Sequence, residues 1–448
     1  MNFVTPLIIP TPKQARFSGE GFSLAETVVV RCGPSWDAAS RILAARLGPR
    51  ARFERVRGDA LTLGKSGATP APPKKPEGYA VSVSKRGVAL SARDDAGKIW
   101  AVQTLLQLFD GTAFHGAEIF DWPTLAFRGV HLFHGPQARP FHEKLIERVF
   151  SPFKLNGLVI QSDTIGWTCL KKSPEHVGSL ADVRAEVAHA RAHGIDAFPL
   201  VPSHGHMWWL LGQGREEFRE DPDSSWALNV TDPRALDLLA TIQNEAAQVF
   251  GSKNHHLGLD EVIDPVTPRG RVPFRSKLPF AELFAANALT WARWGRKKKK
   301  TMWIWADMLM HPSEVKPSFG TAPSVADARK LRQLVPRDFV VVDWQYTARP
   351  TYPSLDVLRD AGFQKRVIAT WFQSDGILAF SKAAVENGAM GGLQTTWCGY
   401  ESAESVLDGP ERRQFAAMVL AAEAFWNSGI APPWTPAEIF DRAWAVKP

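Results

Sequence analysis

The sequence is poor in cysteine and contains no long apolar run. Its three cysteines, Cys32, Cys169 and Cys398, are far apart and lie outside any C-x-x-C spacing. This pattern argues against a disulfide framework and against a cysteine-ligated zinc cluster. No apolar stretch approaches the roughly 20 residues that span a bilayer, and the N-terminus has no basic start followed by an apolar segment. We therefore expect a protein without a membrane span or secretory signal, located in the cytoplasm.

The excess of basic over acidic residues is also small. The net charge is +7, from 53 Lys and Arg against 46 Asp and Glu, and part of it lies in the run 296–300, RKKKK. This run follows a helical pattern and precedes an apolar strand, which favours a solvated helix end over a nuclear signal or a nucleic-acid patch. No aromatic residues alternate with the charges, so we expect no nucleic-acid partner.

Tryptophan is abundant where tyrosine is scarce, with 17 Trp against 4 Tyr. Indole buries a large area, and some of these residues belong to the interior. Several others follow apolar strand patterns, where loops are expected. Indole faces at such positions are a common way to hold a sugar ring or another flat apolar surface, so the composition favours a ligand-binding protein.

A chain of 448 residues exceeds the usual size of one domain. Up to about residue 122, the segments 27–30, 79–83 and 88–90 alternate like strands, and the segments 36–47 and 95–109 have helical spacing. We therefore predict a small α+β accessory domain at 1–122 and a larger domain at 123–448.

From residue 128 the pattern becomes a repeated strand, loop and amphipathic helix. We predict eight strands, at 128–133, 156–162, 196–201, 255–259, 301–306, 338–344, 366–371 and 391–397, with helices such as 143–153, 181–192, 234–250, 280–294 and 325–334 between them. Eight such units predict a (β/α)₈ TIM barrel. A doubly wound sheet is the alternative, but the Gly-rich turn expected after its first strand is absent.

In such a barrel the active site lies at the carboxyl ends of the strands. Acids, histidines and indoles occupy those ends here, namely Asp163, His204, His206, Asp260, Glu261, Trp305, Asp307, Trp344, Trp371 and Trp397. We therefore expect these side chains to meet on one rim.

The segment 254–262, NHHLGLDEV, places Asp260 and Glu261 at the end of the fourth predicted strand. In isolation an Asp-Glu pair is usually a solvated loop, but its place on a Trp-lined rim favours cleavage of a glycosidic bond, in which one acid protonates the leaving oxygen. Neighbouring residues cannot easily flank a sugar as the usual pair of carboxyls does, at ~5–5.5 Å in retaining enzymes. A 2-acetamido sugar removes this difficulty, because its own carbonyl oxygen can attack the anomeric carbon.

The H-x-G-x-D-E-V frame at 256–262 resembles the signature of glycoside hydrolase family 20, the β-N-acetylhexosaminidases. Further segments are similar in order: Phe127-Arg128-Gly129, Lys154-Leu155-Asn156, Asp163 with Gly166-Trp167, and Gly205-His206. The segments IIPTPKQ, EGYAVSV and AGKIWAVQTLLQL resemble the small domain that precedes the family's barrel.

This resemblance implies an exo-acting, retaining enzyme that releases terminal N-acetylglucosamine or N-acetylgalactosamine without a metal or organic cofactor. Glu261 is then the general acid/base, and Asp260 orients the acetamido group and stabilises an oxazolinium-type intermediate. The predicted substrate-binding residues are Arg128, Asp163, His206, Trp305, Asp307, Trp344, Trp371, Trp397 and Glu401.

Departures from the family pattern leave alternatives open. The chain has His131 and Pro202 where the family usually has Asp, and whether Glu401 in W-C-G-Y-E replaces the Glu of a W-x-E pattern is undecided. Arg128 could instead form a structural ion pair, and Asp307 either positions Glu261 or caps a helix. A relative adapted to a modified 2-acetamido sugar, or a carbohydrate-binding protein without activity, remains an alternative function. The oligomeric state does not follow from the sequence.

Overall fold

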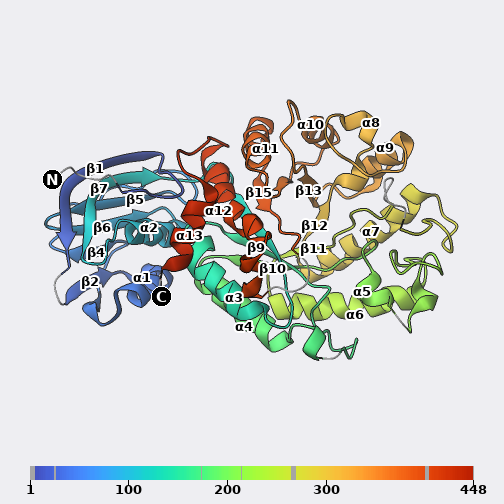
Figure 1. The fold of residues 1–448 in the computed structure, drawn as a ribbon, viewed down its shortest axis with the longest axis horizontal. Helices are drawn as coiled ribbons and strands as arrows, with labels where there is room; N and C mark the ends of the chain where they lie inside the picture. The colour runs from blue at the N-terminus through green and yellow to red at the C-terminus, as the bar shows by residue number, and fades with distance from the viewer. Residues whose placement is uncertain are drawn as a thin grey trace.

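The computed structural model describes residues 6–24, 27–172, 174–212, 214–263, 269–398 and 403–446. It contains an open sheet built from the first part of the chain and a closed barrel built from the rest (Figure 1). The two sheets share no strand among these residues. The predicted division at 122/123 falls in the connection between the last strand of the open sheet and the first strand of the barrel, and we retain it as a proposal.

The open sheet has seven strands in the order β1-β7-β5-β6-β4-β2-β3. Its strands are β1 (Gln14–Ser23), β2 (Val28–Cys32), β3 (Ala51–Arg55), β4 (Leu61–Gly64), β5 (Tyr79–Ser84), β6 (Gly87–Ala92) and β7 (Ala113–Asp121). Helices α1 (Asp37–Leu47) and α2 (Asp95–Gln107) contribute to the apolar core of this part, and α2 contacts β5 and β6. The strands and helices predicted here are therefore present.

The barrel is closed and consists of eight parallel strands, as predicted. They are β8 (Phe127–Phe133), β9 (Gly157–Gln161), β10 (Asp196–Leu200), β11 (Asn254–His256), β12 (Thr301–Trp305), β13 (Val340–Trp344), β14 (Arg366–Thr370) and β15 (Gly391–Gln394). The ring closes where β15 pairs with β8, with Gly391 opposite Phe127. The fold is an α/β TIM barrel preceded by a small α+β unit.

Helices surround the barrel strands in Figure 1. They are α3 (Ala138–Leu145), α4 (Leu180–Ala192), α5 (Trp208–Leu211), α6 (Pro233–Phe250), α7 (Phe280–Lys298), α8 (Pro312–Val315), α9 (Val325–Leu334), α10 (Pro353–Asp360), α11 (Ser374–Asn387), α12 (Arg412–Asn427) and α13 (Pro436–Ala445). The helix predicted at 143–153 is a composite, because α3 passes into a π-helical turn, η3 (Ile146–Phe150). No described helix combines the length and apolar character needed to span a membrane.

The barrel interior is filled by side chains that alternate along the strands. Trp303 and Trp305 lie two residues apart on β12 and both point inward, as their period of two predicts. They pack with Val, Leu, Phe and Ala side chains of five other strands, namely Val159, Phe198, Leu200, Val340, Val342, Val367, Ala369 and Leu393. The barrel centre is thus a packed core, and a site can form only at its ends.

The first unit contacts the amino ends of the barrel strands. Arg128, near the start of β8, is fully buried and pairs with Glu77 of the first unit, with 2.6 Å between Nη2 and Oε2. Its remaining donors bind the carbonyls of Leu125, Ala126 and Lys154. The predicted role of Arg128 as a sugar ligand is therefore wrong. Its guanidinium is bound by Glu77 and backbone carbonyls at the end of the barrel opposite to the rim.

Replacing Glu77 by Gln is expected to lower the free energy of unfolding by about 3–5 kcal/mol, because it leaves the buried guanidinium of Arg128 without a counter-charge. Chemical denaturation measures this loss. Glu20→Gln is the matched control, since Glu20 pairs with Lys85 on the surface, where both side chains are about two-thirds exposed, and such pairs contribute about 0–1 kcal/mol. Equal losses in the two variants would contradict the structural role of Arg128.

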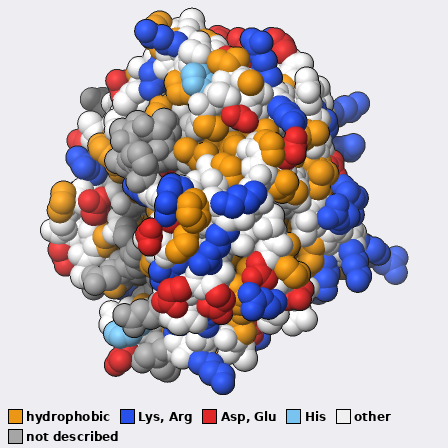
Figure 2. Space-filling model, turned by 90° about the vertical axis from the view of Figure 1, so that its right-hand side faces the viewer, with side chains coloured by type: hydrophobic (Ala, Val, Ile, Leu, Met, Phe, Trp, Pro, Cys, Tyr) orange, Lys and Arg blue, Asp and Glu red, His pale blue; other side chains and the backbone are white. Residues whose placement is uncertain are grey.

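The carboxyl ends of the strands point away from the first unit, toward the end of the molecule shown in Figure 2. Basic side chains gather along one margin of this view, and acidic and basic side chains are interspersed elsewhere. The basic run at 296–299 is exposed around the end of α7, where Lys299 has a left-handed backbone. The run is a solvated helix end, as predicted.

Candidate active site

The loop after β11 carries the two neighbouring acids. The predicted strand 255–259 ends earlier, at His256, because Gly258, Leu259 and Glu261 have positive φ angles of 69°, 69° and 41°. Left-handed backbone is costly for residues other than glycine, so such positions are held by their surroundings. Here the chain turns back sharply enough to present Asp260 and Glu261 side by side.

Both acids face His206, which follows β10. The Nε2 atom of His206 lies 3.2 Å from Oδ2 of Asp260 and 3.4 Å from Oε2 of Glu261. The three side chains are between 18% and 25% exposed, so they remain reachable from solvent. The preceding Gly205 is required for this approach, because a Cβ atom there would lie 2.7 Å from the carbonyl oxygen of Asp260.

The electrostatics of this cluster keep His206 charged. Burial acts to lower the pKa of His206, but the charges of Asp260 and Glu261 outweigh it and raise this pKa to about 10. Burial acts to raise the pKa of Asp260, but the charge and hydrogen bond of His206 outweigh it and hold this pKa below its usual range. At neutral pH the cluster therefore contains an imidazolium ion beside an ionised Asp260.

Asp307, just after β12, is a third acid in the cluster. Its Oδ2 accepts a hydrogen bond of 2.9 Å from the backbone N–H of Glu261 and another from the hydroxyl of Thr321. Of the two roles left open by the sequence, the geometry matches the positioning of Glu261, since the side chain makes no cap hydrogen bond to a helix within the described part of the chain. Burial and the nearby Asp260 raise the pKa of Asp307 to about 7.

Two residues that the sequence analysis did not single out, Trp226 and Arg269, also contact the acid pair. Trp226 donates from Nε1 to the carbonyl of Glu261 at 2.9 Å, and its ring lies 4.2 Å from that of His206. The guanidinium of Arg269 stacks 4.3 Å above Trp226 and approaches Oε2 of Glu261 at 3.9 Å. No motif marks these residues, because they reach the site from long loops.

An aromatic wall stands beside the acids. Trp344 stacks on Tyr346 at 5.3 Å, Tyr346 lies 5.6 Å from Trp371, and Nε1 of Trp397 donates to the hydroxyl of Tyr346 at 3.0 Å. Gln414 of α12 ties the wall together by accepting from Nε1 of Trp371 and from the backbone of Trp397. Each of the three indoles is partly exposed, so together with Tyr346 they offer faces to a ligand.

Beneath the wall lies a buried layer. Trp305 packs against His256 at 4.8 Å and Trp397 packs against His131 at 4.7 Å. Trp305 is only 2% exposed, and Asp163 only 1%. Burial raises the pKa of Asp163 to about 6. Direct contact with a sugar, predicted for both, is not supported, because neither offers surface; they underlie the site instead.

The structure thus brings together Asp260, Glu261, His206, Asp307, Trp344, Trp371 and Trp397, all predicted as site residues. Arg128 is at the opposite end of the barrel, and Glu401 lies outside the described residues. Of the residues that sequence reasoning missed, only Tyr346 had a usable signal, since it follows Trp344 by two residues and therefore continues on the same side of an extended chain.

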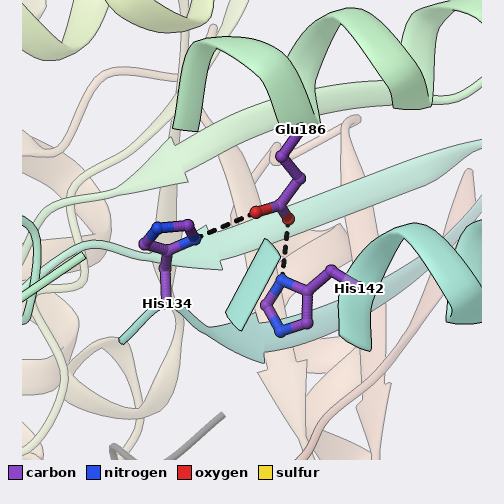
Figure 3. A group of neighbouring side chains, drawn as sticks. All are labelled: His134, His142 and Glu186. Carbon is purple, nitrogen blue, oxygen red and sulfur yellow. Dashed lines mark hydrogen bonds and ion pairs between the residues drawn. The ribbon is translucent and has the colours of Figure 1, made fainter. Parts of the chain in front are cut away.

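A separate histidine-rich cluster lies behind the rim. Glu186 of α4 accepts from Nδ1 of His134 at 2.9 Å and from Nδ1 of His142 at 2.8 Å (Figure 3). All three side chains are completely buried. The His-Glu-His set has ligand types suited to a metal ion. Both carboxylate oxygens of Glu186 already accept hydrogen bonds from the imidazoles, and all three side chains are enclosed, so we interpret the set as a structural network.

Comparisons with known proteins agree with this geometry. Residues 5–122 match the family model described as glycosyl hydrolase family 20, domain 2. Two curated relatives are Beta-hexosaminidase A of Caenorhabditis briggsae, 30% identical over 216 residues, and that of Caenorhabditis elegans, 28% identical over 216 residues. Each match covers 42% of this chain, and the chain spans only 39% and 38% of the relatives' own lengths.

Solved structures extend the likeness to the barrel. The GH20 exo-β-N-acetylglucosaminidase of Vibrio harveyi with N-acetylglucosamine superposes with a TM-score of 0.71 at 17% identity, covering 99% of this chain and 78% of that one. The β-N-acetylhexosaminidase of Bacteroides fragilis gives 0.70 at 19% identity, covering 96% and 92%. At this identity the structures show the fold, and together with the matched first domain they confirm the predicted resemblance to family 20.

Proposed function

We propose that this chain, which is related to glycosyl hydrolase family 20 in its first domain and its fold, is an exo-acting, retaining β-N-acetylhexosaminidase. The observation that carries this proposal is the pair Asp260 and Glu261, held side by side against one imidazole at the carboxyl end of β11. The proposed substrate is a carbohydrate that ends in N-acetylglucosamine or N-acetylgalactosamine. The partly exposed wall of Trp344, Tyr346, Trp371 and Trp397 supports a sugar ligand.

The two acids have different roles: Glu261 transfers a proton, and Asp260 interacts with the amide of the substrate. Glu261 protonates the glycosidic oxygen while the carbonyl oxygen of the 2-acetamido group attacks the anomeric carbon, so that the C–O bond to the leaving group breaks as the new C–O bond forms. Asp260, kept ionised by His206, accepts the amide N–H and stabilises the positive charge that develops on the oxazolinium ring.

A water molecule completes the reaction. Glu261, now ionised, accepts a proton from the water as its oxygen attacks the anomeric carbon, and the ring opens to regenerate the acetamido group. Two inversions at the same carbon give overall retention. In this scheme Asp307 acts indirectly, because its contact with the backbone of Glu261 holds the acid in place.

A panel of aryl glycosides tests the assignment. We expect hydrolysis of aryl β-N-acetylglucosaminide or aryl β-N-acetylgalactosaminide, with the β-anomer of the sugar as the first product by NMR. Aryl β-glucoside, which lacks the amide, is expected to react far more slowly. Equal hydrolysis of the glucoside, or an α-anomer as the first product, would contradict the substrate-assisted mechanism.

Replacing His206 by Asn is expected to move the acidic limb of the kcat–pH profile to higher pH. In the native protein the charge of His206 holds the pKa of Asp260 below its usual range, so ionised Asp260 persists into acid solution. Without that charge, burial dominates and the pKa of Asp260 rises, so the carboxylate is lost at a higher pH.

The profile is measured by steady-state kinetics on an aryl β-N-acetylglucosaminide. His176→Asn is the control, because His176 is 76% exposed and lies outside the cluster. An acidic limb that shifts equally in both variants, or that stays fixed in His206→Asn, would contradict the role given to His206.

A further inference from the structure

A second group of possible metal ligands lies on the barrel flank, far from the rim. Glu147 belongs to the π-helical turn η3, His189 to the last turn of α4, and His193 directly follows that helix. The two histidines are four residues apart and therefore lie on one helical face, with their rings 4.5 Å apart. One ligand atom from each of the three residues lies within 4.8 Å of the others.

The hydrogen bonding of His193 prepares it for a metal ion. Its Nδ1 lies 2.9 Å from the carbonyl oxygen of His189. A carbonyl only accepts, so the proton is on Nδ1 and the lone pair is on Nε2, which is the second-sphere arrangement typical of metal-binding histidines. Burial lowers the pKa of His193, which favours the neutral ring that a metal requires.

His189 turns a buried nitrogen toward the carboxylate of Glu147. Its Nε2 atom is buried and makes no hydrogen bond among the described residues, although Oε1 of Glu147 lies 3.2 Å away. A buried polar atom without a hydrogen bond is unusual and calls for a ligand or another explanation. A cation between this nitrogen and the carboxylate would satisfy both atoms.

The cluster also has access to solvent and space for a fourth ligand. Glu147 and His193 line a cavity of about 610 Å³ between α2 of the first unit and the barrel. Arg148, which follows Glu147 in the chain, turns toward Trp444, to whose carbonyl it donates and over whose ring it stacks at 5.3 Å. The buried network of His134, His142 and Glu186 has no such opening.

We propose that Glu147, His189 and His193 bind one Zn²⁺ ion, with water from the cavity as the fourth ligand. Two imidazole nitrogens and one carboxylate oxygen with an open position are a ligand set that zinc commonly accepts. Bonds of about 2.0–2.2 Å require the three atoms to draw together slightly, which rotation of the exposed Glu147 side chain permits. The site lies outside the proposed catalytic cluster and does not depend on its function.

The test is titration of the untagged, EDTA-treated full chain with ZnCl₂ by isothermal calorimetry. We expect one ion per chain in the wild type and binding at least about tenfold weaker in His189→Gln and in His193→Gln. Mg²⁺, which prefers oxygen ligands, is expected not to compete. His176→Gln is the control for exposed histidines, and circular dichroism verifies that each variant is folded.

Cobalt gives an independent readout, because Co²⁺ in a nitrogen- and oxygen-liganded site of low coordination absorbs visible light. These bands are expected in the wild type and in His176→Gln and are expected to be absent from His193→Gln. The proposal is overturned if the wild type binds no Zn²⁺, or if His189→Gln and His193→Gln bind it as the wild type does. It is also overturned if binding is lost in His142→Gln alone, which would assign the ion to the buried network.

Discussion

Replacing Glu261 by Gln is expected to reduce kcat for an aryl β-N-acetylglucosaminide by about 10²–10⁴-fold, the usual contribution of general acid–base catalysis. Gln keeps the shape of the side chain but cannot give up a proton to the leaving oxygen. The backbone contacts of this position to Asp307 and Trp226 involve the N–H and C=O groups and persist in the variant. Binding of the sugar is therefore expected to change little.

The loss of activity in Glu261→Gln is expected to depend on the leaving group, as it should if Glu261 is the general acid. An aryl oxygen of low pKa needs little protonation, so the loss should be smallest for the best leaving group and largest for a disaccharide. Steady-state rates over a series of aryl groups measure this dependence. Glu282→Gln serves as the control, since Glu282 pairs with Lys330 on the exposed surface of α7. Unchanged rates in Glu261→Gln would refute the assignment of the acid.

Replacing Asp260 by Asn is expected to slow N-acetylated substrates by about 10²–10³-fold, equivalent to about 2.7–4 kcal/mol of lost electrostatic stabilisation by analogy with other preorganised sites. The amide keeps the size of the side chain but removes the negative charge that faces the oxazolinium ring. It also removes a counter-charge of His206, whose pKa is raised mainly by Asp260 against the opposing effect of burial.

Comparison with a sugar that lacks the amide isolates the effect. The ratio of kcat/KM between aryl β-N-acetylglucosaminide and aryl β-glucoside is expected to collapse in Asp260→Asn, because only the first substrate uses the carboxylate. Asp223→Asn is a suitable control, since Asp223 is 85% exposed. If both substrates slow by the same factor, Asp260 supports the fold of the loop and not the amide.

The local pattern of apolar and polar residues was sufficient to predict the architecture. Eight apolar segments separated by helical repeats predicted the closed barrel, because each strand and helix is encoded within a few residues. The strand at β11 was predicted too long, since hydrophobicity alone does not reveal that Gly258 and Leu259 have left-handed backbone. The rim followed from the general rule that a barrel's site lies at the carboxyl ends of its strands.

Contacts between distant parts of the chain set the limit of that reasoning. Arg128 was expected at the ligand because its motif matched, yet its partner is Glu77, 51 residues earlier and in another unit. Trp226 and Arg269 reach Glu261 from loops whose paths no periodicity describes. Burial is equally non-local, so the near-complete enclosure of Asp163 and Trp305 could not be read from their positions in the sequence.

The pairing of β15 with β8, which closes the barrel, affects the order in which strands can pair during synthesis. During translation the edge of β8 waits unpaired until residues 391–394 have been synthesised, an interval on the order of ten seconds or more. All seven strands of the first sheet precede β8 in the chain, so Glu77 is synthesised before Arg128. The strands of the first sheet can therefore pair with one another before the barrel can close.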